Sequence, residues 1–371
     1  MPTDAKQLLE KIRTLALPQN VRIMNVCGGH ERSIAMAGLR TALPKNIELI
    51  PGPGCPVCVC PEEDIYQAIQ IAMNEQVILL AFGDMLRVPV NVPKAAIRTL
   101  EQAKAAGADI RPIASPSEAL TIAKAHPAST VVFFVAGFET TCAPVAAMLT
   151  EGIPKNLLLL MSGRLTWPIV DRLLTSDTPA FDALIAPGHV ATIMGADEWR
   201  FVVEQHHLPT AVAGFTSESL LAAIYSVLRQ FIEQKMFLDN CYTQVVNAEG
   251  NRLAKQLINT TLDIVDAPWR GIGVVPQSGY ELTSTLAEHN ARLHFPAYAD
   301  AARQRAGLMP PGCDCAKVVL GKIKPLECRI YGEPCTPRNP IGPCMVSDEG
   351  ACRIWWAAGL RKEQVTQADL V

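Results

Sequence analysis

Short, uninterrupted apolar runs alternate with amphipathic stretches over the first two thirds of the chain. Such runs are typical of parallel strands that helices cover on both faces. The stretches between them, such as 62–75 and 117–126, carry apolar residues at helical spacing. This alternation predicts an α/β fold with parallel sheets. The predicted strands cover residues 21–26, 47–52, 77–82, 109–114, 130–137, 156–161, 183–188 and 210–215.

These strands form two sets of four that begin in a similar way. The first set opens with "NVCGGHERSIAMAGL" and the second with "FVAGFETTCAPVAAML". In each, a strand ends on a small residue and a glycine, a glutamate follows, and a helix begins. The similarity predicts two related parallel-sheet α/β lobes, residues 1–117 and 118–240, and a long helix over 216–235 ends the second lobe.

The chain changes character after residue 240. Residues 269–282 could form a hairpin or an irregular segment, and from 307 onward the sequence is rich in Pro, Gly and Cys. Such a segment cannot bury enough apolar surface to fold by packing alone, but metal–thiolate bonds can replace that packing. We therefore expect a C-terminal segment, 241–371, that ends in a small loop-rich iron–sulfur domain over about residues 300–371.

The composition limits which cellular compartment and which classes of partner we expect for this protein. Hydrophobic residues make up 49% of the chain, and the net charge of −3 offers no basic surface for nucleic acid or an acidic membrane. No apolar run approaches the roughly 18 residues of a membrane span, and the N-terminus lacks a signal-peptide pattern. We expect a cytoplasmic protein whose twelve cysteines serve as metal ligands or redox groups rather than as structural disulfides.

Six of the cysteines lie in the C-terminal segment and suit a metal centre. Zinc sites usually combine two short Cys-x2–4-Cys pairs, whereas here only Cys313 and Cys315 are close. Wider spacing is typical of an iron–sulfur cubane, whose irons need well-separated ligands. A zinc site and scattered structural thiols are the alternatives. The six residues are Cys313, Cys315, Cys328, Cys335, Cys344 and Cys352.

The sequence "IPGPGCPVCVCPEED", residues 50–64, holds a second group of thiols. Cys55 and Cys58 form a Cys-x-x-Cys unit before a predicted helix start, where the helix dipole can activate a thiol. Cys27 follows the first predicted strand, and the Cys-x-x-Cys unit follows the second. If these strands are neighbours, the three thiols meet in one crevice, because open α/β sheets place their sites at the carboxyl ends of strands. Half of a metal site and a turn that only packs are the alternatives.

Other residues at strand ends are candidates that also have structural interpretations. His30 could tune the Cys27 thiolate, bind a metal or cap a helix. The further residues that could either line the crevice or cap turns are Asp84, Glu139 and His189. The thiols that we interpret as bystanders or as buried apolar groups are Cys60, Cys142 and Cys241.

Several unusual motifs together resemble the HypD family of [NiFe]-hydrogenase maturation factors. They span nearly the whole chain and occur in the same order as in that family. They are "CGGHE" (27–31), "GPGCPVCVCP" (52–61), "FGDMLRVP" (82–89), "GFETT" (137–141), "APGHV" (186–190) and the cysteine-containing segment 315–352.

This resemblance implies a [4Fe–4S] cluster on four C-terminal cysteines. Cys313 is the rival for the first ligand position, and Cys344 is the spare thiol. Trp355 and Trp356 would cover the cluster from solvent. The ligands carried over by motif are Cys315, Cys328, Cys335 and Cys352.

The resemblance also implies that the first thiol group helps to assemble the Fe(CN)2(CO) unit of the hydrogenase. Cys27, supported by His30, would hold the iron together with a cysteine of the small partner HypC. Cys55 and Cys58 would switch between dithiol and disulfide, and Cys58 would also bind iron. Cyanide would come from the thiocyanate of the partner HypE, and the cluster would supply electrons.

Two other functions fit the cysteines without the resemblance. An iron–sulfur disulfide oxidoreductase would use Cys55 and Cys58 to reduce a protein or small disulfide and would then release it. A zinc-stabilised binding module would have no redox chemistry. Of the three functions, we expect a redox-active maturation scaffold rather than a turnover enzyme.

Overall fold

The computed structural model describes residues 3–176, 181–299 and 309–362. Two parts of the predicted iron–sulfur domain, 300–308 and 363–371, lie outside the described residues. Within the described part of the chain, no helix is both long and apolar enough to cross a membrane.

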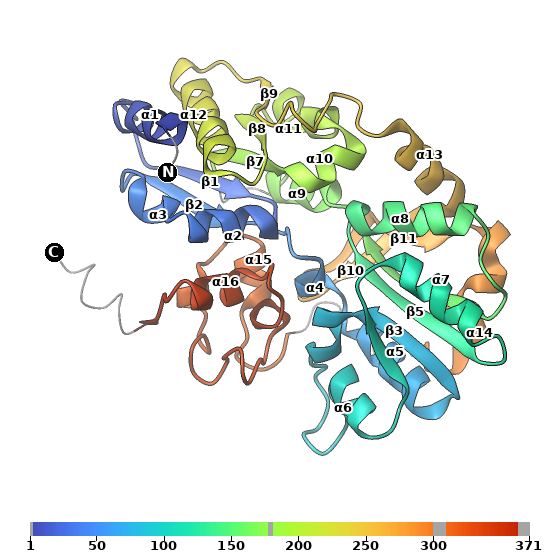
Figure 1. The fold of residues 1–371 in the computed structure, drawn as a ribbon. Helices are drawn as coiled ribbons and strands as arrows, with labels where there is room; N and C mark the ends of the chain where they lie inside the picture. Colours follow the sequence, from blue (N-terminus) through green and yellow to red (C-terminus); the bar gives the residue numbers. More distant parts are fainter. Residues whose placement is uncertain (1–2, 177–180, 300–308, 363–371) are drawn as a thin grey trace.

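Five parallel strands form the first sheet, whose spatial order is β2-β1-β7-β8-β9. Most of their residues are buried, because helices cover both faces of the sheet (Figure 1). The strands are β1 (Val21–Asn25), β2 (Ile47–Pro51), β7 (Ala183–Pro187), β8 (Thr210–Ala213) and β9 (Leu238–Asn240).

Six strands form the second sheet, in the order β10-β11-β6-β5-β3-β4. The pairs among β3 to β6 are parallel, whereas the β10–β11 hairpin joins β6 in antiparallel fashion. The strands are β3 (Val77–Phe82), β4 (Ile110–Ile113), β5 (Thr130–Gly137), β6 (Leu157–Arg164), β10 (Leu262–Trp269) and β11 (Gly273–Leu282).

All eight predicted strands are confirmed, as is the α/β class with two largely parallel sheets. The sheets nevertheless do not follow the predicted lobe boundary at residue 117, because each takes strands from both sides of it. The chain leaves the first sheet after β2, builds β3 to β6 in the second, and returns with β7. Apolar runs identify buried strands, but they carry no information about which sheet a strand joins.

The helices connect the strands and fill both sides of the sheets. The long helix predicted over 216–235 is confirmed as α12. Residues 269–282 form the turn and second strand of a hairpin whose first strand, β10, begins at Leu262. The helices of the N-terminal half are α1 (Thr3–Arg13), α2 (Gly28–Met36), α3 (Leu39–Ala42), α4 (Pro56–Val59), α5 (Glu62–Asn74), η1 (Gly83–Arg87), α6 (Leu100–Ala105), α7 (Pro116–Ala125), α8 (Glu139–Thr150) and α9 (Trp167–Leu174). Those that follow are α10 (Gly188–Met194), η2 (Ala196–Trp199), α11 (Arg200–Glu204), α12 (Ser217–Glu233), α13 (Arg252–Thr261), η3 (Ser284–His289), α14 (Ala291–His294) and η4 (Pro296–Tyr298).

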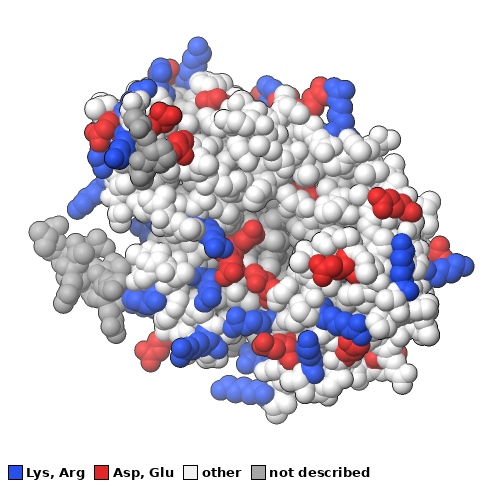
Figure 2. Space-filling view, viewed as in Figure 1, with Lys and Arg blue, Asp and Glu red and all other residues white. Residues whose placement is uncertain are grey.

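The cysteine-rich tail, residues 309–362, packs beside α2 and α4 (Figure 1). Buried side chains of the tail, among them those of the six C-terminal cysteines, belong to the same apolar cluster as residues of both sheets. Figure 2 shows a hollow near the centre of this face, with acidic and basic side chains around it. The short helices of the tail are α15 (Cys315–Val319), η6 (Pro325–Glu327), η7 (Pro343–Met345) and α16 (Ala351–Ala357).

Candidate thiol and metal centre

Cys27 lies between the end of β1 and the first residue of α2, at the N-cap position. Since β1 and β2 are neighbours, the loops that follow them meet. The amide of Gly28 donates a hydrogen bond to the carbonyl of Gly54 over 3.1 Å. A Cβ atom added at Gly54 would lie 2.4 Å from the Cα of Cys27, so only glycine allows this approach. The backbone of the second loop therefore rests directly on Cys27.

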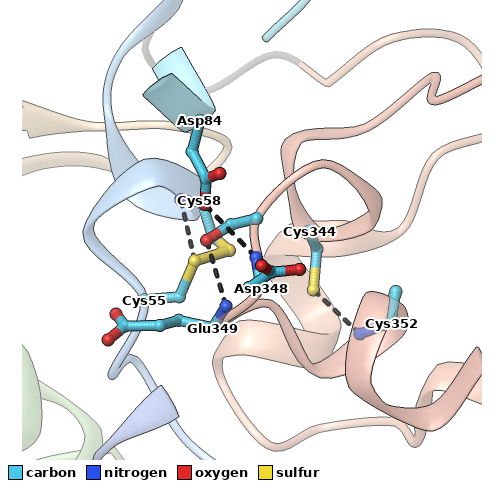
Figure 3. Close-up of a disulfide and its surroundings, with 8 residues drawn as sticks. Cys55, Cys58, Asp84, Cys344, Asp348, Glu349 and Cys352 are labelled. Carbon is cyan, nitrogen blue, oxygen red and sulfur yellow. Dashed lines mark hydrogen bonds between the residues drawn. A yellow bond between two sulfur atoms is a disulfide. The ribbon is translucent and has the colours of Figure 1, made fainter. Parts of the chain in front are cut away.

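Cys55 and Cys58 form a disulfide at the two ends of the first turn of α4 (Figure 3). Pro56 begins the helix, a position where its missing N–H costs nothing. The amide of Cys58 donates to the Sγ of Cys55 over 3.1 Å. Both side chains are buried, Cys58 with only 2% of its surface exposed. The sequence predicted a pair able to switch between dithiol and disulfide, and the structure holds the disulfide form.

One small pocket connects the two thiol groups of the protein. Cys27, Cys55 and Cys58 line it from the sheet side, and Cys344 and Glu349 line it from the tail. The structure therefore brings together the three thiols that the strand order was expected to bring together. It also adds Cys344, which the sequence analysis set aside as spare, and Glu349, which the sequence analysis did not identify.

Burial controls the acidity of the groups around this pocket. It raises the pKa of the Cys27 thiol to about 12, although the amides of His30 and Gly29 oppose the shift. Burial also raises the pKa of Glu349, with a smaller contribution from the negative charge of Asp84. Without a cation, Cys27 is therefore a protonated thiol. A bound soft metal would displace that proton and stabilise the thiolate.

His30 is buried and lies under the loop after β8. Its Nε2 donates to the carbonyl of Ala213 over 2.9 Å, and its Nδ1 has no hydrogen-bond partner among the described residues. Burial lowers the pKa of this histidine to about 4, so its ring is neutral. Phe215 separates it from His189, with the His189 and Phe215 rings stacked at 3.9 Å. The backbone amide of His30 donates toward the Cys27 sulfur, but His30 is not one of the residues that line the pocket.

The other candidates at strand ends, Asp84, Glu139 and His189, do not line the pocket. Asp84 accepts a hydrogen bond from the amide of Asp348 over 3.2 Å and so fixes the tail (Figure 3). Glu139 accepts from the amide and the hydroxyl of Thr166 through Oε1. Burial raises the pKa of Glu139 to about 7. His189 is exposed, and its ring stacks on the Phe215 ring.

The C-terminal cysteines gather on the tail side of the pocket. The sulfurs of Cys315, Cys344 and Cys352 all lie within 4.8 Å of one another, a distance that one metal centre can span. The sulfur of Cys313 lies 3.2 Å from that of Cys315. A Cβ atom added at Gly342 would lie 2.4 Å from the Cys315 sulfur, so this glycine leaves room for the thiols.

Cys328 and Cys335 complete this sulfur-rich region. Both are buried, and the charges of Cys313 and Cys315 help to raise the pKa of each, after burial itself. The amide of Ile341 donates to the Cys335 sulfur over 3.4 Å. The donor set is therefore rich in thiols, buried and drawn from short helices and the loops between them, which fits an iron–sulfur cluster with four cysteine ligands.

Three cysteines lie outside both groups. The Cys60 sulfur lies 3.4 Å from the Ser162 hydroxyl, and Cys60 does not line the pocket. Cys142 is fully buried in the core of the second sheet, and Cys241 is partly buried beside α12. Burial raises the pKa of the Cys60 and Cys241 thiols to about 12. These environments match the interpretation of Cys60 as a bystander.

Comparison with known proteins identifies the family. Residues 3–359 match the HypD family model, described as "Hydrogenase formation hypA family". The chain is 37% identical to the hydrogenase maturation factor HypD of Azotobacter vinelandii, over 97% of this chain and 96% of that protein. It is also 37% identical to HypD of Escherichia coli K12, over 96% of this chain and 95% of that protein. A putative hydrogenase expression/formation protein of Methanocaldococcus jannaschii is 38% identical, over 95% of this chain and 96% of that protein. The chain therefore belongs to the HypD family of hydrogenase maturation factors.

Proposed function

We propose that this protein is a scaffold on which the Fe(CN)2(CO) unit of [NiFe]-hydrogenases is assembled. The observation that carries the proposal is the small pocket that Cys27 shares with the Cys55–Cys58 pair and with Cys344. In this pocket Cys27 could bind a soft metal, and Cys55 and Cys58 could exchange two electrons. Cys344 adds a thiol from the cysteine-rich tail. Family membership supplies the biological setting for this chemistry.

In this proposal the iron is the cargo, and Cys27 is its ligand from this chain. Thiolate sulfur suits electron-rich iron. The first amides of α2, those of Gly29 and His30, donate toward the Cys27 sulfur and would stabilise the thiolate. Asn25 also lines the pocket, and its Oδ1 has no hydrogen-bond partner among the described residues, so it can accept a hydrogen bond from a donor that enters the pocket. A cysteine of a HypC-type partner would complete the site.

The C-terminal thiols would hold a [4Fe–4S] cluster, which supplies single electrons when bound. We propose Cys328, Cys335 and Cys352 as three of its ligands and Cys315 as the fourth. Cys313 remains the rival, because its sulfur lies 3.2 Å from that of Cys315. All four thiols are buried, as a cluster requires, but the sulfurs within 4.8 Å of one another are those of Cys315, Cys344 and Cys352, so Cys344 is a second rival for a ligand position.

The Cys55–Cys58 pair can release cyanide from a thiocyanate by a balanced two-electron reaction. The S–C bond of R–S–C≡N breaks, and a sulfur–sulfur bond forms between Cys55 and Cys58. The two thiol protons leave with the products, one on R–SH and one on HCN. Reopening the disulfide then takes up two electrons and two protons. The thiocyanate would be that of a HypE-type partner in the cytoplasm.

The burial of the disulfide favours this scaffold over the alternative oxidoreductase. An enzyme that reduces protein disulfides must expose one sulfur to a protein substrate, because thiol–disulfide exchange proceeds through a mixed disulfide. Cys55 and Cys58 are 4% and 2% exposed, and the tail covers them. Both reactions need a partner's sulfur group to reach this pair, and a narrow pocket admits a single thiocyanate-bearing side chain more easily than a disulfide held in a folded protein.

Anaerobic co-purification with HypC-type and HypE-type partners, followed by infrared and Mössbauer spectroscopy, tests the proposal. The scaffold function predicts a stable complex with CN and CO stretching bands and a separate [4Fe–4S] signal. Rapid turnover of a disulfide substrate by the isolated protein, without those bands in the complex, would support the oxidoreductase and contradict the scaffold.

A further inference from the structure

Arg270 occupies a buried junction between the two thiol groups. It lies in the turn of the β10–β11 hairpin, and only 2% of its surface is exposed. Its amide donates to the carbonyl of Val59, the last residue of α4, over 2.9 Å. The next residue, Gly271, has a φ of 73°, and a Cβ atom added there would lie 2.7 Å from the Cβ of Ala316. The turn therefore contacts both the Cys55–Cys58 helix and the helix that begins at Cys315.

The charge of Arg270 is only partly matched by protein groups. Its Nη2 donates to the carbonyl of Pro89 over 2.7 Å and lies 3.6 Å from the Oε2 of Glu62. Its Nε and Nη1 are buried and have no hydrogen-bond partner among the described residues. Leaving buried donors of a charged group unpaired costs free energy, so a guanidinium in this state indicates a missing anionic partner.

Besides the Glu62 carboxylate, the tail cysteines are groups near Arg270 that can carry negative charge. Gly271, the residue after Arg270, lies directly against Ala316, and Ala316 follows Cys315 in the chain. Arg270 therefore lies within electrostatic range of an anionic group that the tail cysteines hold. Arginine keeps its charge at every physiological pH.

We propose that Arg270 is the counter-charge of the iron–sulfur cluster and raises its reduction potential. The inference rests on the proposed function, because it requires the cluster. A cubane with four thiolates gains one negative charge when it accepts one electron. A fixed positive charge nearby stabilises that more negative, reduced form. At the effective dielectric constant typical of proteins, a unit charge within about 10 Å changes such an equilibrium by about tenfold or more.

Potentiometric titration of the anaerobically purified protein with dithionite and mediators, followed by electron paramagnetic resonance, tests the inference. Arg270→Gln should make reduction about tenfold less favourable, which lowers the potential by about 59 mV for a one-electron couple. Arg270→Lys keeps the charge and should stay close to wild type. Glu62→Gln removes the carboxylate that partly neutralises Arg270, so it should raise the reduction potential. This variant tests the inference even if the Arg270 variants do not fold.

Arg329→Gln is the matched control. It also removes one positive charge beside the tail cysteines, but the Arg329 side chain is 70% exposed and paired with Asp314, so solvent screens it. A potential unchanged in both Arg270→Gln and Glu62→Gln, or an equal shift in Arg329→Gln, would overturn the inference. Absence of any cluster signal in the wild-type protein would instead refute the proposed function, and this inference with it.

Discussion

The indole Nε1 of Trp355 donates a hydrogen bond to the buried carboxylate of Glu31 over 2.7 Å and joins segments 324 residues apart. Glu31 lies on α2, one turn after Cys27, and Trp355 lies on α16, three residues after Cys352. The other carboxylate oxygen accepts from Arg40 over 2.7 Å and from Asn25 over 3.1 Å. One buried carboxylate therefore ties the Cys27 side of the pocket to the tail.

Trp355→Phe should lower the free energy of unfolding by about 1–3 kcal/mol. The substitution leaves an oxygen of the buried, charged Glu31 without its donor. Urea unfolding followed by circular dichroism measures the change. Trp356→Phe is the control, because Trp356 is only half-buried and packs under the Arg361 guanidinium, so its loss should cost less. Equal effects of the two variants would contradict the role of the Glu31 bond.

Gly54→Ala should destabilise the protein by more than about 2 kcal/mol and separate Cys27 from the disulfide. The new methyl group would lie 2.3 Å from the backbone nitrogen of Cys27, and backbone cannot yield to it cheaply. The measurements are the melting temperature and the rate at which iodoacetamide alkylates Cys27, which should rise. Gly83→Ala is the control, since an added Cβ there meets no atom within 4 Å. An unchanged alkylation rate in Gly54→Ala would count against the close approach.

The buried carboxyl of Glu139 should make stability depend on pH. Its pKa is raised from 4.5 to about 7, mainly by burial, so the folded state favours the protonated form. The stabilisation is fully present below pH 4.5 and is lost as pH rises through 7, with a slope of at most about 1.4 kcal/mol per pH unit. The difference in unfolding free energy between wild type and Glu139→Gln, measured from pH 4.5 to 8, reports this group alone. A difference that does not vary with pH would contradict the prediction.

If electrons reach the pocket through the tail thiols, Cys344→Ala should slow the reduction of the Cys55–Cys58 disulfide by dithionite. The disulfide is buried, and Cys344 is the tail thiol that shares its pocket. Alkylation of the new thiols followed by mass spectrometry measures the rate. Cys60→Ala is the control, because the Cys60 sulfur contacts Ser162 and lies outside the pocket. If Cys344→Ala reduces at the wild-type rate, the disulfide receives its electrons by another route.

The eight strands could be predicted because buried parallel strands are continuous apolar runs, and "TVVFFVAG" or "VILLAF" has no other simple interpretation. The partition into two sheets could not, because β2 and β3 look alike in sequence although they join different sheets. The meeting of Cys27 with Cys55 and Cys58 was predictable, since it follows from one assumption: that β1 and β2 are neighbours.

The positions of the other site residues depend on loop geometry, which the spacing of residues along the chain does not determine. The turn at Gly342 and Pro343 brings the Cys344 sulfur close to those of Cys315 and Cys352. The spacing of the cysteines along the chain gives no sign that Cys344, rather than Cys328 or Cys335, lies beside them. Arg270 follows an edge strand in a hairpin turn, where sequence patterns favour an exposed side chain. It is buried because the turn packs against α4, the Pro89 carbonyl and the tail.

Infrared spectroscopy of the complex with the HypC-type and HypE-type partners, formed with Cys27→Ala, tests the central claim most directly. Cys241→Ala is the matched control, because this partly buried cysteine lies outside both thiol groups. If Cys27 holds the iron, the CN and CO stretching bands should appear with wild type and Cys241→Ala and be absent with Cys27→Ala, while the Mössbauer signal of the cluster persists in all three. Bands of wild-type intensity with Cys27→Ala would contradict the claim that this pocket holds the iron.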